Sequence, residues 1–548
     1  MKDKRQPTPT EREDVLVIGA GPVGLTAALT LANAGVSVTV VEKSNQPGDL
    51  PRAISLQDES FRILDQLGLA DALKAESLLD TGSRYFGLNE RLLAEAKPVA
   101  SRLGHPAKTQ FDQPIMEQIL FDAAGEHPDI TMRLGSELVE LTQDLDAVYA
   151  TIDTDGQQET LVAKWLIGAD GGKSFVRQRL DIALEGSTQP QRWLVVDLRN
   201  EPTQRDPYAE FHCDGQRPYV LVPGIDGRLR IEYMLFDNED ADAMVEPAKV
   251  RELMLPFRKN LAPEDIRRAA VYVAHQRVAE SYRSGRCFLV GDAAHLMPPF
   301  AGQGLNAGLR DSANIAWKLI DVLRGGASDA LLDTYQVERK THGAKMMKLS
   351  QRIGSVVMAT NPIATRVRDT VIRGLQFLPT VHSYLANMRF VTPPNYTDGV
   401  AVTTNSITEI PGATVGLSLS QPDVVDATGA TTGLDAHLQQ GWSLIGLNAD
   451  TTTVDPYFDA LLTTRVRLQS PGADLDANSD ELQLAEVTAT LTKDLTVPTY
   501  ILVRPDRYVA AIFTQAEQAQ VVMQMRNFID DRMRTFRASA DAALNTHL

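Results

Sequence analysis

The stretch that most constrains the fold of this chain spans residues 14–42. It contains an apolar segment (DVLVI), the glycine pattern GAGPVG, a helical segment that stops at a glycine, a second apolar segment (SVTVV) and a glutamate. This order of strand, GxGxxG turn, helix, strand and acid is the fingerprint of a dinucleotide-binding βαβ unit. A lone GxGxxG pattern is weak evidence, because glycines punctuate many turns. The complete context predicts a parallel α/β sheet that binds a nucleotide.

Four residues of this unit are candidates for the nucleotide site. Gly19 permits the tight turn, Gly21 lets the backbone approach a pyrophosphate, and Gly24 allows the helix to pack closely on the strand. Glu42 follows at the end of the second strand, where its carboxylate accepts hydrogen bonds from ribose hydroxyls. The pattern is compatible with both FAD and NAD.

A second stretch, GDAAHLMPPFAGQGLN at residues 291–306, predicts the other half of the ligand site. It lies between an apolar strand at residues 287–290 and a helical segment at residues 307–323, so its glycines and prolines suit a backbone that grips an anion. The carboxylate of Asp292 would repel a phosphate, and it fits here only if it accepts a hydrogen bond from a sugar hydroxyl. The sequence therefore predicts a nucleotide with an exposed ribose or ribitol chain.

Composition and charge limit the classes of partner. The chain has 548 residues and a formal net charge of −17, which argues against nucleic acid or an anionic membrane as its main partner. Its two cysteines, Cys213 and Cys287, form no CxxC pair, which excludes a disulfide framework and a cysteine-based metal site. No apolar run approaches the about 18 residues of a spanning helix, and residues 1–13 lack the apolar region of a signal peptide. We expect a cytoplasmic protein that needs no metal.

Between residues 193 and 282 the pattern changes to short strands separated by turns, with one helix near residues 247–261. An antiparallel sheet inserted between nucleotide-binding segments is expected to form one wall of a substrate pocket. Each polar aromatic residue on these strands is individually more often a core or surface residue than a catalytic one. As a set on one sheet, four of them are the candidates for the substrate pocket: His212, Tyr219, Tyr233 and His275.

The C-terminal part of the chain predicts a separate module. Helical segments continue through residues 330–390 with breaks at Pro362 and Pro379, and a Pro-rich linker follows. Residues 400–548 then combine apolar strands with a charged amphipathic helix at about residues 515–540. This alternation predicts an α/β domain of its own.

Three motifs, in this order and spacing, resemble the single-component FAD-dependent aromatic hydroxylases, which are flavoprotein monooxygenases of the p-hydroxybenzoate and phenol hydroxylase type. The motifs are GAGPVG with Glu42, GADGGKSFVR at residues 168–177 and the stretch at residues 291–306. The resemblance covers residues 14–345, and RWLVVDLRN at residues 192–200 is similar to 3-(3-hydroxyphenyl)propionate and resorcinol hydroxylases. The C-terminal module resembles the thioredoxin-like domain that many of these enzymes carry. Without a CxxC pair, it is expected to be structural.

Together with the strand and helix patterns, the resemblance implies an α/β fold of three parts. A Rossmann-like FAD-binding domain carries an inserted antiparallel-sheet substrate domain and is followed by the thioredoxin-like domain. The expected boundaries are a disordered tail at residues 1–13, the FAD-binding domain at 14–80, 110–190 and 283–392, the substrate domain at 81–109 and 191–282, and the C-terminal domain at 400–548.

The resemblance also implies roles for individual residues. The expected FAD-binding residues are Gly19, Gly21, Gly24, Glu42, Arg52, Gln113, Asp170, Asp292, Gly302, Gly304, Leu305 and Asn306. The first four would hold the ADP part, Asp170 lies in a motif associated with both FAD and NAD(P)H, and the last four would present backbone N–H groups to the flavin ring. Arg52 taken alone has the pattern of a solvated loop residue, and the resemblance reverses that interpretation.

The implied activity is the hydroxylation of a 3-(3-hydroxyphenyl)propionate- or resorcinol-like phenol by O₂. NADH or NADPH would be the transient co-substrate, and a flavin C4a-hydroperoxide would carry the oxygen. Pro298 is the expected active-site contact through its carbonyl, whereas His295 is expected to be a packed structural histidine. Phenol hydroxylases place a catalytic acid two residues after the position of Arg52, and this chain has Ile54 there. The group that activates the substrate hydroxyl is therefore unassigned, with the four polar aromatics as its candidates.

Two alternatives remain open. A flavin reductase, or a monooxygenase of a larger polycyclic phenol, would use the same fold and the same FAD site, and a halogenase would usually carry a WxWxIP motif that this sequence lacks. A non-catalytic FAD-binding interaction protein is a different class, which the loop at residues 298–306 disfavours because it adjoins the reactive ring. The oligomeric state is also open, with a homodimer as one alternative.

Overall fold

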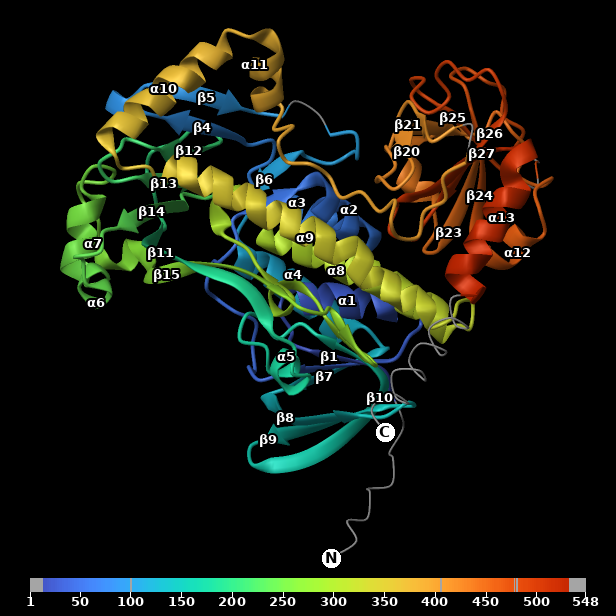
Figure 1. The fold of residues 1–548 in the computed structure, drawn as a ribbon, viewed down its shortest axis with the longest axis horizontal. Helices are drawn as coiled ribbons and strands as arrows, with labels where there is room; N and C mark the ends of the chain where they lie inside the picture. The colour runs from blue at the N-terminus through green and yellow to red at the C-terminus, as the bar shows by residue number, and fades with distance from the viewer. Residues whose placement is uncertain (1–12, 99–100, 405–406, 478, 480, 532–548) are drawn as a thin grey trace, which may run out of the picture.

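The computed structural model describes residues 13–98, 101–404, 407–477, 479 and 481–531. A mostly parallel sheet lies at the base of the molecule, with strand order β16–β17–β10–β1–β2–β7 and with β8 and β9 joined to it through β10 (Figure 1). Its strands are β1 (Glu13–Ile18), β2 (Val38–Glu42), β7 (Ile130–Leu134), β8 (Ser136–Gln143), β9 (Val148–Thr154), β10 (Gln157–Gly168), β16 (Arg283–Ser284) and β17 (Cys287–Leu289). The central strand β1 pairs in parallel with both β2 and β10, as the βαβ fingerprint predicts. Of the tail predicted at residues 1–13, all but Glu13 lies outside the described residues.

Three helices pack beside this sheet: α1 (Pro22–Ala32), α4 (Gln113–Glu126) and α8 (Gly304–Leu323). Helices α1 and α4 contact the strands, and α8 packs on α1. Shorter elements connect them, namely β3 (Ser55–Gln57), α2 (Asp58–Gln66), α3 (Ala70–Ala75), β6 (Lys108–Gln110) and α5 (Phe175–Arg179). Helix α1 is apolar on nearly every side because it lies between the sheet and α8, and all but two of its residues are buried.

A second sheet has the order β18–β15–β11–β14–β13–β12–β4–β5. Its strands are β4 (Gly82–Phe86), β5 (Leu92–Ala96), β11 (Leu184–Leu198), β12 (Tyr208–His212), β13 (Tyr219–Pro223), β14 (Leu229–Leu235), β15 (Ile266–Ala279) and β18 (His295–Leu296). The pairs are antiparallel as expected, except that β12 and β4 run in parallel. The helix predicted at residues 247–261 is α7 (Pro247–Met254), which ends earlier than expected. A short helix, α6 (Ala241–Met244), precedes it.

Three helices follow α8 in the chain: α9 (Ala330–Val357), α10 (Pro362–Gln376) and α11 (Pro379–Ala386). The two predicted breaks are confirmed, because Pro362 and Pro379 each start a new helix at its first position. Helices α10 and α11 pack on β5, so this part of residues 283–392 lies with the second sheet and not with the parallel one (Figure 1).

The C-terminal domain contains a seven-stranded mixed sheet of order β22–β21–β25–β24–β23–β26–β27. Its elements are β19 (Glu409–Ile410), β20 (Ala413–Thr414), β21 (Asp423–Asp426), β22 (Thr431–Gly433), β23 (Trp442–Leu447), α12 (Tyr457–Leu461), β24 (Leu462–Gln469), β25 (Leu482–Glu486), β26 (Thr499–Val503), β27 (Val509–Thr514) and α13 (Gln518–Arg526). Strand β23 pairs in parallel with β24 and antiparallel with β26, which is the order of a thioredoxin-like core. The end of the helix predicted at residues 515–540 lies outside the described residues.

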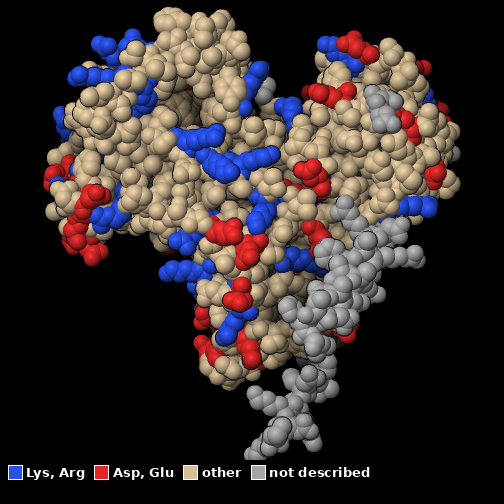
Figure 2. All heavy atoms as spheres, in the orientation of Figure 1, with Lys and Arg blue, Asp and Glu red and all other residues tan. Residues whose placement is uncertain are grey.

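On the molecular surface a notch separates the C-terminal domain from the lobe that carries α10 and α11, and acidic and basic side chains are interspersed over this face (Figure 2). None of the helices in the described ranges combines the length and the apolar character of a membrane span.

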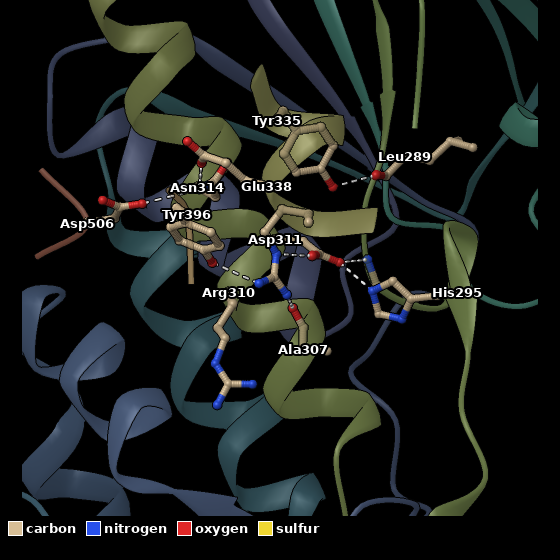
Figure 3. Close-up of polar contacts among 12 residues, drawn as sticks. Leu289, His295, Ala307, Arg310, Asp311, Asn314, Tyr335, Glu338, Tyr396 and Asp506 are labelled. Carbon is tan, nitrogen blue, oxygen red and sulfur yellow. Dashed lines mark hydrogen bonds and ion pairs between the residues drawn. The ribbon is translucent and has the colours of Figure 1, made fainter. Parts of the chain in front are cut away.

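Buried charges below the notch join the C-terminal domain to α8 and α9. Glu338 on α9 accepts hydrogen bonds from Arg504 at 2.8 and 2.9 Å and from Lys318 at 2.8 Å, and all three side chains are excluded from solvent. Asn314 on α8 also donates to Glu338 and to Asp506 of the C-terminal domain (Figure 3). Burial would raise the pKa of Glu338, but Arg504 and Lys318 lower it to about 2.

Glu338→Gln is expected to destabilise the folded protein by about 3–5 kcal/mol, because it leaves two buried cations without their shared carboxylate. The measurement is the shift of the urea and thermal unfolding midpoints at neutral pH. The matched control is Glu252→Gln, which removes an exposed partner of Lys249 and should cost less than about 1 kcal/mol. Equal midpoints for the two variants would contradict the role of the Glu338 cluster.

Candidate active site

A cavity of about 740 Å³ opens between the parallel sheet and the second sheet. Its lining combines the ends of β1 and β2, the N-terminal ends of α1 and α8, the loop at residues 46–55 and one face of the second sheet. Ten of the twelve expected FAD-binding residues line it: Gly19, Gly21, Glu42, Arg52, Gln113, Asp170, Asp292, Gly302, Gly304 and Leu305. The structure therefore brings together residues that are up to 286 positions apart in the sequence.

At one end of the cavity the βαβ turn forms a cradle of backbone groups. Gly19 has φ +108°, and a Cβ there would lie 2.5 Å from the carbonyl oxygen of Ala169. A Cβ at Gly21 would meet nothing within 4 Å, so its backbone faces the cavity. No side chain caps the N-terminus of α1, whose backbone N–H groups are available to a phosphate. Glu42 accepts a hydrogen bond from the backbone N–H of Ala20 at 2.9 Å, which holds its carboxylate beside this turn.

Gly24 does not line the cavity, because its role is in packing. A Cβ at this position would lie 2.0 Å from the carbonyl oxygen of Gly19 and 3.1 Å from the Cβ of Ala169. Only glycine lets α1 approach the turn and the end of β10 this closely. This placement agrees with the packing role that the GxGxxG pattern assigns to its third glycine.

The other end of the cavity is built by the start of α8. No side chain caps this helix either, and a Cβ at Gly304 would meet nothing within 4 Å. Gly302, with φ +60°, turns the chain into the helix. A second helix N-terminus thus points its positive end into the same cavity, where it favours a negatively charged group.

Asn306 is fully buried and holds the cavity wall from behind. Its side-chain oxygen accepts hydrogen bonds from the N–H of Gln57 at 2.9 Å and the hydroxyl of Ser60 at 2.6 Å. Its amide donates to the carbonyl oxygens of Ser55 at 3.1 Å and Gly302 at 2.7 Å. The prediction for Asn306 concerns its backbone N–H group; its side chain has a positioning role, since it fixes α8 to the strand β3.

The loop at residues 51–53 is fastened from two sides. Gln113 accepts a hydrogen bond from the N–H of Ala53 at 2.6 Å. From the second sheet, Arg230 donates to the carbonyl oxygen of Arg52 at 2.7 Å, and Arg268 donates to that of Pro51 at 2.7 Å. The exposed side chain of Arg52 lies on the cavity wall, where its charge suits a phosphate or the substrate entrance.

Two carboxyl groups face the cavity between its ends. Burial raises the pKa of Asp292, while the charges of His295 and Arg52 lower it in part. Burial also raises the pKa of Asp170, whose Oδ2 accepts from the N–H of Val176 at 3.0 Å. Within the described residues, its Oδ1 is buried without a hydrogen-bond partner. Both groups are suited to accept hydrogen bonds from ligand hydroxyls.

Beneath the cavity, Asp311 of α8 ties the loop at residues 291–295 to the helices (Figure 3). Its Oδ2 accepts from the N–H of Gly291 at 3.0 Å and lies 2.6 Å from Nε2 of His295. Its Oδ1 accepts from Arg339 of α9 at 2.7 Å, and Arg339 also donates to Tyr396 and to the carbonyl oxygen of Ala307. His295 is fully buried in this network, which agrees with the structural role predicted for it.

The four polar aromatics predicted for the substrate pocket do not line the cavity. His212 stacks between Phe86 and Tyr219 and lies 2.7 Å from a carboxylate oxygen of Glu90. The side chains of Tyr219 and Tyr233 pack under α7, and the Tyr233 hydroxyl donates to the carbonyl oxygen of Leu253. His275 is exposed on the distant β11–β15 ribbon, beside Thr188.

The predicted residues of β12, β13 and β14 miss the cavity because side chains alternate between the two faces of a strand. The residues of the second sheet that face the cavity are the neighbours of the predicted ones, and they include Phe211 on β12, Val220 on β13 and Glu232 on β14. Arg230 and Glu232 are two charged residues of equal parity within the apolar strand LRIEYML, and this signal identifies the inward face. Pro298 is buried, and its neighbours Met297 and Pro299 line the cavity on either side of it.

The residues of this cavity fit FAD. The first uncapped helix N-terminus and Glu42 suit the ADP part, Asp292 suits the ribityl hydroxyls, and the second helix N-terminus suits the electronegative edge of the flavin ring. A family model described as the FAD binding domain matches residues 12–350, and one described as the HcaD C-terminal domain matches residues 416–528. The chain belongs to the FAD-dependent aromatic hydroxylases. FAD is its cofactor, as predicted.

Curated relatives extend this finding. A 3-(3-hydroxy-phenyl)propionate/3-hydroxycinnamic acid hydroxylase of Comamonas testosteroni is 40% identical over 390 residues, which cover 71% of this chain and 66% of the relative. A hydroxylase of the same name from Mycolicibacterium smegmatis is 38% identical over 386 residues, which cover 70% of this chain and 68% of the relative. The matched segment spans about two thirds of the length of these relatives.

Solved structures share the fold over nearly the whole chain. The flavin-dependent monooxygenase PieE, in complex with FAD and substrate, has a TM-score of 0.80 at 22% identity and covers 96% of this chain and 100% of its own. The agreement includes the C-terminal domain, so the predicted three-part architecture is confirmed.

Asp292→Ala is expected to weaken FAD binding, because the ribityl hydroxyls lose an acceptor in the cavity wall, at a cost of about 1–3 kcal/mol or about 10–100-fold in the dissociation constant. The measurement is the flavin absorbance that remains with the protein after dialysis. The matched control is Asp237→Ala, which removes an exposed carboxylate outside the cavity. Full FAD occupancy in the Asp292 variant would refute the role given to this residue.

Proposed function

We propose that this protein hydroxylates a phenol that carries a short acid arm, using its FAD, O₂ and NADH or NADPH. The names of its relatives support this substrate class, because they are hydroxylases of 3-(3-hydroxy-phenyl)propionate and 3-hydroxycinnamic acid. The observation that carries the proposal is the part of the cavity formed by the second sheet. It is an apolar slot with a carboxyl group in its wall.

The slot has the lining of a site for an aromatic ring. Its floor includes Phe211, Val220 and Val222 from the second sheet, and Tyr85 stacks on Phe211 with 4.8 Å between ring centroids. Side chains that follow α8 in sequence form further lining, among them Ile353 of α9. An apolar slot of this kind binds a ring and excludes water from the reacting carbon.

Glu232 is the carboxyl group in this wall. It accepts a hydrogen bond from the hydroxyl of Tyr272 at 3.0 Å, and Arg230 lies 3.8 Å away. Burial raises the pKa of Glu232, although Arg230 lowers it in part. Tyr272 belongs to the same apolar cluster as Ile54, the position that carries an acid in phenol hydroxylases. The carboxyl group thus reaches the slot from β14 and not from the loop after Arg52.

In the proposed reaction, Glu232 accepts a hydrogen bond or the proton from the phenol hydroxyl. This raises the electron density of the ring, which attack by an electrophilic oxygen requires. A carboxylate with a raised pKa is a stronger base than a carboxylate with the usual pKa. The position of Glu232 and its raised pKa therefore both favour removal of the phenol proton. When bound, FAD supplies hydride acceptance from NAD(P)H and the activation of O₂. The N-terminus of α8 stabilises negative charge on the flavin edge.

A steady-state assay tests the proposal. The FAD-loaded protein is mixed with NADH or NADPH in the presence of 3-(3-hydroxyphenyl)propionate, resorcinol or a larger polycyclic phenol. We expect the first compound to accelerate NAD(P)H oxidation and to give a diol that contains one atom of ¹⁸O from labelled O₂. Stimulated oxidation without labelled product indicates a reductase, and the absence of stimulation by every phenol indicates a non-catalytic flavoprotein. Either result would overturn the proposal.

Glu232→Gln is expected to lower kcat by about 100-fold or more, because the amide cannot accept the phenol proton. In the unchanged protein, kcat/KM should fall as the pH is lowered through the raised pKa of Glu232, because only its ionised form acts as a base. This acidic limb should disappear in the variant. The matched control is Glu210→Gln, which changes a carboxylate on β12 that is not part of the cavity lining. An unchanged acidic limb in the Glu232 variant would exclude Glu232 as the base.

A further inference from the structure

Lys108 is a charged residue of the cavity wall that the proposed reaction leaves without a role. It lies on β6 and donates from Nζ to the hydroxyl of Ser83 at 2.5 Å and to the carbonyl oxygen of Gly82 at 3.0 Å. No acidic side chain of the described residues forms an ion pair with it. A cation that is withdrawn from water without a counter-charge is unfavourable, and an anion beside it removes that cost.

The remaining N–H of the Lys108 ammonium group is available to a ligand, because two neutral oxygens use only two of its three donors. Burial lowers the pKa of Lys108 to about 8, and a bound anion would raise it again. Ser83, which is 2% exposed, holds the ammonium group in place at the end of the slot formed by β4.

The strand register places Tyr85 and Glu232 at opposite ends of one row across the second sheet, and Lys108 reaches the Tyr85 end from β6. Tyr85 of β4 pairs with Phe211 of β12, Phe211 pairs with Val220 of β13, and Val220 pairs with Glu232 of β14. Lys108 is bonded to Ser83, two residues before Tyr85 and on the same face of β4. The apolar side chains between the two charges are those that form the floor of the slot.

Lys108 and Glu232 line the same cavity on opposite sides of the apolar floor. Three strand spacings of about 4.8 Å separate β4, beside Lys108, from β14, which carries Glu232. An aromatic ring with a hydroxyl on one side and an acid arm on the other is suited to reach both charges.

We infer that Lys108, held by Ser83, binds the carboxylate of the substrate and makes the enzyme select phenols with an acid arm over neutral phenols. The inference rests on the proposed function for the identity of the substrate. With the carboxylate at Lys108 and the hydroxyl at Glu232, the ring lies over the apolar floor that includes Phe211 and Val220. Lys108 is thus a specificity-determining residue, and Glu232 alone takes part in the proton step.

The experiment compares an acid with its neutral isostere. The acid is 3-(3-hydroxyphenyl)propionate and the isostere is 3-(3-hydroxyphenyl)propan-1-ol, each with the FAD-loaded protein and its Lys108→Met and Lys108→Arg variants. We expect Lys108→Met to lower kcat/KM for the acid by about 10–100-fold, the loss of one charge-assisted hydrogen bond, mainly through KM. The alcohol should change less than about 3-fold, and Lys108→Arg should keep part of the preference for the acid. The matched control is Lys97→Met, an exposed lysine that does not line the cavity.

A binding measurement separates this inference from the proposed function. The ligands are 3-phenylpropionate and 3-phenylpropan-1-ol, which lack the phenol hydroxyl, and their dissociation constants are read from the change in flavin absorbance. A preference for the acid that Lys108→Met removes supports the subsite, even if no phenol is hydroxylated and the proposed function fails. Equal losses for acid and alcohol, or none for either, overturn the subsite even where hydroxylation is found.

Discussion

The geometry of the flavin end depends on one buried carboxylate, that of Asp311. Its two oxygens bind the backbone of Gly291, the ring of His295 and the guanidinium group of Arg339. Burial would raise the pKa of Asp311, but His295 and Arg339 hold it below its usual range. Because the loop at residues 291–295 and the start of α8 both face the cavity, this carboxylate fixes the distance between them. The loss of Arg339 would remove the guanidinium charge that compensates this carboxylate in the core.

A second set of buried charges supports the same helices from the side of the C-terminal domain. Glu338 joins α8 and α9 to Arg504, and Glu59 of α2 accepts hydrogen bonds from Arg310 of α8 and from Tyr508. Helix α8 is therefore held between α1 on one side and the C-terminal domain on the other. This explains how a thioredoxin-like domain without a CxxC pair contributes: it braces the helix whose N-terminus faces the flavin, and it needs no redox chemistry for that.

The sequence predicts the parts of this site that are local and misses those that depend on pairing. The GxGxxG turn and the helix breaks at Pro362 and Pro379 follow from backbone constraints that act within a few residues. Local constraints do not show which face of the second sheet points into the cavity. A shift of one residue exchanges the two faces of a strand, and both faces of β13 and β14 are buried, so the hydrophobic pattern does not distinguish them. For the same reason Tyr219 and Tyr233 were expected where Val220 and Glu232 lie. The contact between Lys108 and Ser83 joins two segments that are distant in the sequence, and no local pattern indicates that they lie close together.

The two halves of the cavity select their ligands by different physical means. The cofactor half uses backbone N–H groups at two helix ends, which bind phosphate and flavin oxygens in any chain that can form these turns. The substrate half uses side chains placed by strand register on the second sheet, and Lys108 joins its wall from β6. A sheet paired on both sides resists changes in the spacing of its strands, whereas the identity of a single residue in a row changes easily. Substrate length in this fold should therefore be altered by moving a charge from one strand to the next, and ring size by changing the apolar residues between the charges.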